Sequence, residues 1–392
     1  MVIIYMNIRD DFLYYSRPYI TEDAISRVEA VLRSGWWTSA KEVKEFESRF
    51  AEAVGAKYAV AVNSCTAALE LSLYGLGIKA GDEVITTPMT FCSTVHSIVR
   101  CGATPVFADI DANTGLIDVK EIEKKINSRT KAILPVHYAG QACNMNAIKD
   151  LANKHSLFVI EDAAHAFGTE YDGKPIGSMG YPTAFSFYVT KNLATGEGGM
   201  LTTNDKDFAD LARKLSLHGM NRDAWNRYGS HGSWFYEVDE CGFKFNMPDI
   251  LATIGLSQMD HFAEMQEARL KFADYYRQRI DEIKGVDYLK TAPLSNNAEH
   301  LFVIKIGEEL SIDRDEFIKQ LTDYKIGTSV HFIPVHLHPY YKNTLGTKQG
   351  DYPNCEAFFN QIISIPLYPS MTFEDVKYVA DAIEEIAAKH SK

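Results

Sequence analysis

Short apolar runs alternate with amphipathic segments through the middle of the chain. The apolar runs are rich in β-branched and aromatic residues, which predicts buried strands over residues 58–62, 83–87, 104–110, 131–136, 157–161, 184–189 and 200–203. Between them, apolar residues recur at the spacing of one helix face, as in residues 67–74, 146–154 and 205–215. This alternation predicts an α/β fold with a mostly parallel sheet and helices on both faces. Ligands on such sheets bind at the carboxyl ends of the strands.

The two ends of the chain follow other patterns. Residues 7–20 are polar and aromatic without a clear period, which predicts an arm lying on another surface. A helix is expected from about Thr21, whose hydroxyl can cap it, and a second over residues 41–54. From residue 249 a long helical stretch runs to about residue 283, and strands then alternate with helices to the end. We therefore expect an N-terminal arm (1–20), a large domain (21–255) and a smaller C-terminal α/β domain (256–392).

Charge and composition narrow the class of protein. The net charge of −12 argues against a nucleic-acid partner, and no apolar run is long enough to cross a bilayer. The apolar start, residues 1–6, lacks the basic region of a signal peptide. The six cysteines form no CxxC pair and are expected to be reduced thiols, without a metal site. These features predict a cytoplasmic protein without a membrane partner.

A single lysine follows the apolar run over residues 184–189. Lys191 stands between that run and a glycine-rich turn, Gly196-Glu-Gly-Gly199, before the next strand. Desolvation at such a place lowers the pKa of an ammonium group, and the free amine can attack an aldehyde to form an imine. A lone lysine at a strand end is more often a plain surface residue, so the rest of the chain has to decide.

Polar residues also follow two other predicted strands. Asn63-Ser64-Cys65-Thr66 opens a predicted helix, where free N–H groups and hydroxyls favour a phosphate, although Ser64 alone is typical of a plain helix cap. Asp162 ends the strand 157–161 and can hold a ring nitrogen protonated, or equally cap the next turn. His165 and Phe91 can contact or stack on a planar ring, but core packing is the commoner state of each.

Three histidines stand close together near the C-terminal end. His331, His336 and His338 lack a nearby acidic or cysteine residue at ligand spacing, which argues against a zinc site. A strand and turn that face a substrate are the better interpretation, with His331, His336 and Tyr340 as polar contacts.

These motifs, in this order, resemble the DegT/DnrJ/EryC1/StrS family of sugar aminotransferases. The resemblance covers nearly the whole chain and includes Val136-His-Tyr-Ala-Gly140, Gly242-Phe-Lys-Phe-Asn246 and Pro366-Leu-Tyr-Pro-Ser370. It implies the type I, aspartate aminotransferase-like fold, pyridoxal 5′-phosphate as cofactor, and a homodimer with shared active sites. With this resemblance, a functional role becomes the better interpretation of Lys191, Asp162 and Ser186, in place of a plain structural one.

The resemblance assigns roles residue by residue. It implies that Lys191 forms the Schiff base, that Asp162 pairs with the pyridinium nitrogen, and that His165 lies beside the ring with Phe91 stacked on it. Three residues match the phosphate cradle: Cys65, Thr66 and Ser186. Cys65 departs from the glycine that the family often has there. Lys244 and Asn246 match a segment that reaches the phosphate from a neighbouring subunit, with lysine in place of the family's usual residue.

The motif variants look closest to the branch that aminates C4 of UDP-linked 4-keto pentoses and hexoses. The implied reaction moves an amino group from L-glutamate to a nucleotide-linked keto sugar, in two steps that use Lys191 as the base. Three alternative functions fit the sequence less well. A dehydratase of the same family carries histidine in place of Lys191, a nicotinamide-dependent sugar oxidoreductase needs a glycine fingerprint that is missing here, and an inactive scaffold would not need Lys191 and Asp162 together.

Overall fold

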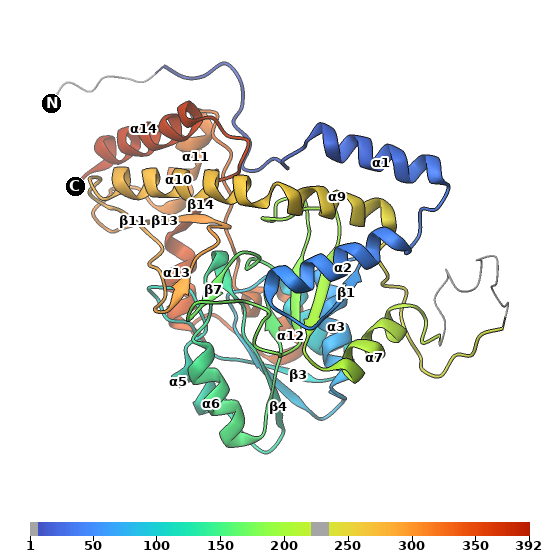
Figure 1. Ribbon diagram of the computed structural model, residues 1–392. Coiled ribbons are helices and arrows are strands. Elements are labelled where there is room, and N and C mark those ends of the chain that lie inside the picture. Colours follow the sequence, from blue (N-terminus) through green and yellow to red (C-terminus); the bar gives the residue numbers. More distant parts are fainter. Residues whose placement is uncertain (1–6, 221–234) are drawn as a thin grey trace.

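The computed structural model describes residues 7–220 and 235–392 (Figure 1). A mixed sheet in the large domain is built from two four-stranded groups, β1-β10-β9-β6 and β3-β2-β4-β5. Backbone hydrogen bonds from Ile160 to Ile133 and from Asp162 to Pro135 join them, so β5 and β6 act as one interrupted strand. In spatial order the strands are β1 (Tyr58–Val62), β10 (Gly199–Thr203), β9 (Thr183–Ser186), β6 (Glu161–Asp162) with β5 (Phe158–Val159), β4 (Thr130–Leu134), β2 (Glu83–Thr86) and β3 (Thr104–Phe107).

The direction of the strands decides where their ends meet. β10 is antiparallel to β1 and β9, whereas the pairs β9–β6, β5–β4, β4–β2 and β2–β3 are parallel. Since β10 is antiparallel to both of its neighbours, β1 and β9 point the same way as each other and as the parallel strands. The carboxyl ends of β1, β2, β4, β6 and β9 therefore share one edge of the sheet with the start of β10. The predicted, mostly parallel α/β sheet is confirmed.

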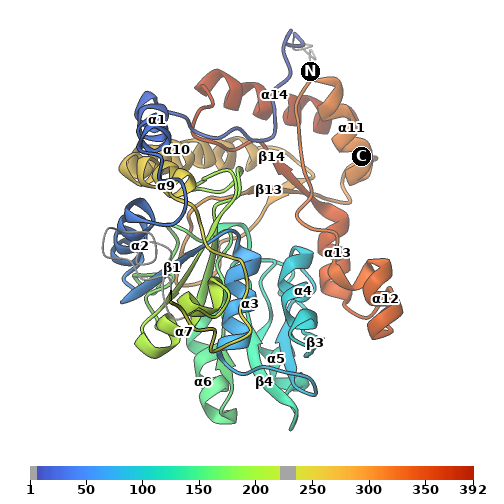
Figure 2. The same ribbon diagram turned by 90° about the vertical axis from the view of Figure 1, so that its right-hand side faces the viewer.

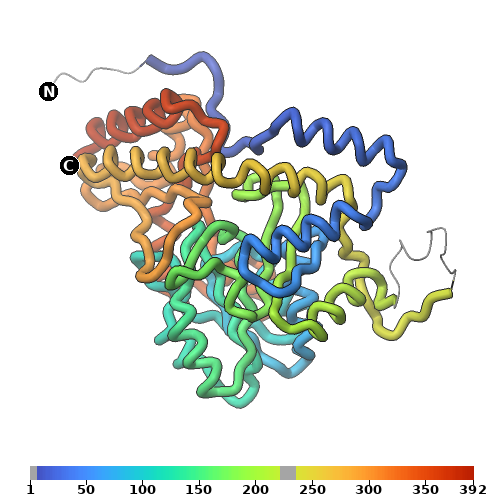
Figure 3. Tube along the Cα trace, in the orientation of Figure 1, coloured from blue at the N-terminus to red at the C-terminus, as the bar shows by residue number. Residues whose placement is uncertain are grey.

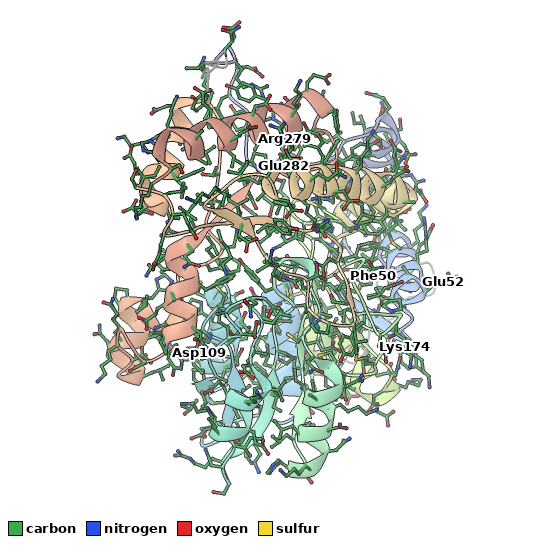
Figure 4. All side chains as sticks on the ribbon, turned by 90° about the vertical axis from the view of Figure 1, so that its left-hand side faces the viewer. Phe50, Glu52, Asp109, Lys174, Arg279 and Glu282 are labelled. Carbon is green, nitrogen blue, oxygen red and sulfur yellow. The ribbon has the colours of Figure 1, made fainter. Side chains whose placement is uncertain are left out.

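Alternate residues along each strand enter different cores, which explains the apolar runs. Val60, Val84 and Leu201 belong to a core under helices α3 (Cys65–Gly75), α4 (Cys92–Arg100) and α7 (Lys206–Ser216). Ala61, Ile85 and Met200 belong to a second core under helices α2 (Lys41–Val54), α5 (Val119–Lys125), α6 (Met145–His155) and α9 (Asp249–Asp260). Figure 2 shows α3 and α4 side by side on the first of these faces, and Phe50 of α2 is labelled in Figure 4.

The long helical stretch expected over residues 249–283 is two helices. It is interrupted at His261, where α10 (Phe262–Ile280) begins. α9 packs against α1 (Glu22–Ser34) and α2, whereas α10 packs against α14 (Phe373–His390), so the break lets the two halves join different cores. Thr21 caps α1 as predicted, because its hydroxyl accepts a 3.1 Å hydrogen bond from the Ala24 amide.

The C-terminal part has its own sheet and core. The strands are β11 (Val286–Tyr288), β13 (Phe302–Ile306) and β14 (Ile362–Ile365), covered by α10, α11 (Arg314–Asp323) and α14. The connection between β13 and β14 also holds α12 (Pro339–Leu345), α13 (Pro353–Gln361) and the 3-10 turn η2 (Val335–Leu337). Asp109, labelled in Figure 4, joins the two parts: its carboxylate accepts from the Asn354 and Cys355 amides, both at 2.9 Å.

Two smaller features complete the description. A small sheet is formed by β12 (Ser295–Asn296), β7 (Glu170–Tyr171) and β8 (Lys174–Pro175), and η1 (Tyr138–Gly140) follows β4. The predicted arm runs beside the C-terminal helices (Figure 3), where Leu13 pairs with Ile326 and Arg9 forms a 3.0 Å ion pair with Asp375. The irregular sequence over residues 218–242, rich in Gly, Asn and Trp, predicts a long functional loop, most of which lies outside the described residues. Within the part of the chain that the structure covers, no helix is long and apolar enough to cross a membrane.

Candidate active site

A cavity of about 500 Å³ lies at the shared edge where the strands end. Its walls bring together eight residues singled out from the sequence: Cys65, Thr66, Phe91, Asp162, His165, Ser186, Lys191 and His331. They come from the start of α3, the turn before α4, β6 and the turn after it, the end of β9 and the segment after it, and the chain between α11 and η2. Residues up to 266 positions apart in sequence, Cys65 and His331, therefore share one space.

Lys191 lies at the end of the turn that follows β9. Its backbone amide donates a 2.8 Å hydrogen bond to the Tyr188 carbonyl, which fixes the turn. Burial lowers the pKa of the Lys191 ammonium to about 8, and the nearby Cys65 and Asp162 oppose that shift. An amine with this pKa is partly unprotonated near neutral pH, as attack on an aldehyde requires.

The carboxylate of Asp162 is buried at the base of the cavity. One oxygen accepts a 2.7 Å hydrogen bond from the Thr94 hydroxyl, and the other accepts from the Ala164 amide at 3.1 Å. Burial raises the pKa of Asp162, while these hydrogen bonds and the charge of Lys191 lower it. The neighbouring Glu161 faces the opposite side of the sheet, where it bonds to His137 at 2.9 Å. His137 is thus a core residue and not part of the cavity.

The start of α3 forms a cradle beside Lys191. Ser64 caps the helix through a 3.1 Å bond from the Ala67 amide, and the amides of Cys65 and Thr66 belong to the first turn, whose N–H groups have no carbonyl partner within the helix. β10 approaches this turn so closely that a Cβ on Gly199 would lie 2.4 Å from the Ser64 carbonyl carbon and 2.6 Å from the Cys65 nitrogen. Only glycine therefore allows the approach, and the cradle suits a phosphate.

Two rings line the cavity, one exposed and one buried. Phe91 precedes α4, and its side chain is 58% exposed, so one face is free to cover a planar ligand. The ring centroids of Phe91 and Phe332 lie 5.9 Å apart. His165 is buried, and its Nδ1 accepts a 3.3 Å hydrogen bond from the Ala139 amide. Burial lowers the pKa of His165 well below its usual value, so the ring is neutral with the proton on Nε2.

The structure separates the predicted sugar contacts. His331 lines the cavity, and its Nδ1 lies 2.9 Å from the Ser364 hydroxyl. Burial lowers the pKa of His331 to about 3, so it is a neutral side chain. His336 is turned away from the cavity and bonds to Glu356 at 2.9 Å, while Tyr340 packs beside His96 and Tyr341 on α12. Neither His336 nor Tyr340 reaches the cavity of this chain.

Lys244 and Asn246 also lie outside the cavity of their own chain. They are next to the end of β1, where Asn246 pairs with Val62. The Lys244 ammonium donates to the Asn246 amide oxygen at 2.5 Å, and the Asn246 nitrogen donates to the Ser39 hydroxyl at 2.8 Å. The segment is thus ordered and held at the surface.

Sequence reasoning missed two groups that hold the site. His300 donates from Nδ1 to Asn192, the residue after Lys191, at 2.9 Å, and its ring lies 4.3 Å from that of His165. Thr94 bonds to Asp162. Both pairs join segments far apart in the chain, and no local pattern marks either one.

The chain is similar to known proteins over most of its length. The model of the DegT/DnrJ/EryC1/StrS aminotransferase family matches residues 18–384. The chain belongs to this family. Two curated members show how similar its relatives are. A spore coat polysaccharide biosynthesis protein, SpsC, from Bacillus subtilis (strain 168) is 51% identical over 96% of this chain and 98% of its own length. The UDP-4-amino-4-deoxy-L-arabinose–oxoglutarate aminotransferase of Shewanella sediminis (strain HAW-EB3) is 41% identical over 96% and 98%.

Solved structures of the family agree with the fold and cofactor. The putative sugar aminotransferase Spr1654 from Streptococcus pneumoniae, in its PLP-form, is 32% identical with a TM-score of 0.91, covering 96% of this chain and 99% of that one. Its PMP-form matches with the same TM-score. The predicted type I fold and the dependence on pyridoxal 5′-phosphate are confirmed, and the family member described here is an aminotransferase. Its cavity offers an amine, a buried carboxylate and a helix start, which fit the aldehyde, ring nitrogen and phosphate of that cofactor.

Proposed function

We propose that this aminotransferase moves an amino group from L-glutamate to a nucleotide-linked 4-keto sugar, with a UDP-linked pentose or hexose as the acceptor. The names of two relatives support this choice: one is a UDP-4-amino-4-deoxy-L-arabinose–oxoglutarate aminotransferase, and the other is a spore coat polysaccharide biosynthesis protein. The product would be an amino sugar for a cell-surface polysaccharide or lipopolysaccharide.

The proposal rests on one observation: Lys191 and Asp162 line the same cavity. The cofactor, when bound, supplies an electron-accepting ring. Asp162 holds the proton on the ring nitrogen, and the α3 start with Thr66 and Ser186 holds the phosphate. Lys191 Nζ, free as the amine, takes the proton from Cα of L-glutamate. In the half-reaction with the keto sugar, Lys191 Nζ gives a proton back to the sugar carbon that receives the amino group.

The sugar side of the cavity is assigned to His331. Its ring is neutral and lies at the wall of the cavity, so it can donate or accept one hydrogen bond without adding charge. We assign no sugar contact to His336 and Tyr340, because neither side chain lines the cavity of this chain.

We also propose a homodimer with shared sites. Lys244 and Asn246 are held at the surface beside β1 rather than in their own cavity, as a contribution to a second copy would require. Several apolar side chains are exposed on the described surface, among them Trp37, Tyr74 and Phe91.

The absorption spectrum of the purified protein tests the function directly. We expect a band from lysine-linked cofactor that changes to the pyridoxamine form when L-glutamate is added, and Lys191→Ala should fold normally but lose turnover. UDP- and dTDP-linked 4-keto sugars are then offered as acceptors. A Lys191→Ala protein that still transaminates would overturn the role of this lysine. Loss of a sugar hydroxyl without amino transfer would instead favour a dehydratase, and a protein that binds no cofactor would favour a scaffold.

A further inference from the structure

Two threonine hydroxyls form a chain of hydrogen bonds that ends on Asp162. The Thr94 Oγ1 lies 2.7 Å from Asp162 Oδ2, and the Thr90 Oγ1 lies 2.7 Å from that of Thr94. Thr94 is fully buried in α4, and Thr90, only 2% exposed, stands at the wall of the cavity. The bond from Thr94 to Asp162 is therefore shielded from water, which makes it stronger and its loss more costly.

The charge of Asp162 decides which way the hydrogens point. An ionised carboxylate can only accept, so Thr94 must donate its single hydrogen to Asp162. The Thr94 oxygen is then left as an acceptor, and Thr90 must donate to it. Both O–H dipoles point toward the carboxylate and stabilise its negative charge.

The other oxygen of the Asp162 carboxylate, Oδ1, also accepts from protein groups. The Ala164 amide donates to Oδ1 at 3.1 Å, and the Cys65 sulfur lies 4.0 Å from the same oxygen. Each oxygen thus receives one strong donor from protein, and the plane of the carboxylate is fixed. Burial alone would favour the neutral acid, which cannot keep a ring nitrogen protonated.

We propose that Thr94, supported by Thr90, is a positioning residue that keeps Asp162 ionised and oriented toward the ring nitrogen of the cofactor. The inference rests on the proposed role of Asp162. It predicts that cofactor binding becomes sensitive to acid when the hydroxyl of Thr94 is removed, because the carboxylate then protonates at a higher pH.

The test measures the affinity of the full-length protein for pyridoxal 5′-phosphate from pH 6 to pH 8.5. For Thr94→Val we expect the dissociation constant to rise roughly tenfold over wild type at pH 6, and by less at pH 8.5, because a hydrogen bond to a charged group is lost. Thr94→Ser keeps the hydroxyl and should restore wild-type binding. Thr90→Val removes only the outer donor and should give a smaller change with the same dependence on pH.

A matched control comes from β2, the strand that precedes Thr90 and α4 in the chain. Thr86 is also fully buried, and its hydroxyl donates to the Leu134 carbonyl at 2.8 Å instead of to a carboxylate. Thr86→Val therefore repeats the loss of a buried hydroxyl without touching Asp162. Equal dissociation constants for Thr94→Val and Thr86→Val at every pH would overturn the inference.

Three further outcomes are separated by the same measurements. If Thr94→Val fails to fold, Thr90→Val and Thr94→Ser decide the question, and a Thr90→Val protein with the affinity of Thr86→Val at pH 6 counts against the proposal. If the wild-type protein binds the cofactor and Asp162→Asn binds equally well, the proposed role of Asp162 fails and the inference fails with it. If wild type and Asp162→Asn differ but the threonine variants do not, only the inference is overturned.

Discussion

His300 and Asn192 are joined by a 2.9 Å hydrogen bond, although 108 positions separate them in sequence. The Asn192 amide nitrogen donates to the Ala298 carbonyl at 2.7 Å, so its oxygen is the acceptor for His300 Nδ1. Asn192 follows Lys191 directly, and residues 298–300 lead into β13 of the C-terminal part. The position of the lysine therefore depends on how the two parts of the chain pack.

Replacing Asn192 by alanine should destabilise the protein. The change leaves the buried imidazole N–H of His300 without its acceptor and removes one of the two donors to the Ala298 carbonyl, which keeps its 3.1 Å bond from Gln266. The loss costs about 2 kcal/mol of unfolding free energy. Denaturant unfolding of the cofactor-free protein measures it. Asn296→Ala, which removes an exposed 3.1 Å bond to Glu170, is the control and should cost less than about 0.5 kcal/mol. Equal losses for the two variants would mean that the buried network adds nothing.

The pKa of Lys191 should appear in the rate of cofactor uptake. Burial lowers this pKa to about 8, and only the unprotonated amine attacks an aldehyde. The uptake rate of the cofactor-free protein is thus expected to be low at pH 6.5, to rise through a midpoint near pH 8 and to level off above it. Stopped-flow absorbance follows the reaction. Lys191→Arg stays charged over this range and should show no such phase, and a midpoint near the usual lysine value of 10.5 would contradict the prediction.

Gly199→Ala should weaken the phosphate cradle. The new Cβ would lie 2.4 Å from backbone of Ser64, so β10 and the start of α3 must move apart. We expect a loss of about 1–3 kcal/mol in stability and a cofactor dissociation constant at least about tenfold higher. Gly173→Ala is the control: it meets no atom within 4 Å but has a φ of 72°, so it costs about 1 kcal/mol in stability alone. Unchanged cofactor affinity in Gly199→Ala would show that the close approach does not shape the site.

His331 and His336 should behave differently when each is replaced by alanine. His331→Ala removes a polar group from the cavity wall, and we expect kcat/KM for the keto sugar to fall by about tenfold or more while the half-reaction with L-glutamate changes little. His336→Ala breaks the bond to Glu356 outside the cavity, so stability should fall by about 1–3 kcal/mol with unaltered kinetics. Single-turnover spectra of each half-reaction, together with thermal unfolding, separate the two results. A sugar-specific defect in His336→Ala would reverse the assignment.

Mixed subunits should reveal whether active sites are shared. A Lys191→Ala subunit and a Lys244→Ala/Asn246→Ala subunit are each expected to be impaired alone. If Lys244 and Asn246 serve a second copy, a mixed dimer has one site without defects, and equal mixing recovers about a quarter of wild-type activity. Mixing after mild denaturation and refolding, with tagged subunits, measures the recovery. No recovery in verified mixed dimers would place each active site within one chain.

Local patterns account for the strands and most of the helices, and they single out Asp162 and Lys191 as candidates. Val60, Val84 and their apolar neighbours predict buried strands because both faces of the sheet are covered. Asp162 and Lys191 stand at or after the ends of such predicted strands, and the family resemblance is what favours a role in the site over a plain structural one. A property that depends on a few consecutive residues, such as burial on both faces or the cap by Thr21, is readable from the sequence.

The remaining features depend on contacts between distant segments. His331 and His336 stand five positions apart in the same motif, yet His331 lines the cavity, whereas His336 lies in the 3-10 turn η2 and bonds to Glu356. The antiparallel course of β10, the bond from Thr94 to Asp162 and the bond from His300 to Asn192 likewise arise only when the chain closes on itself. Hydrogen-bond geometry between such segments is set by the packing of the whole fold, and no local spacing of residues encodes it.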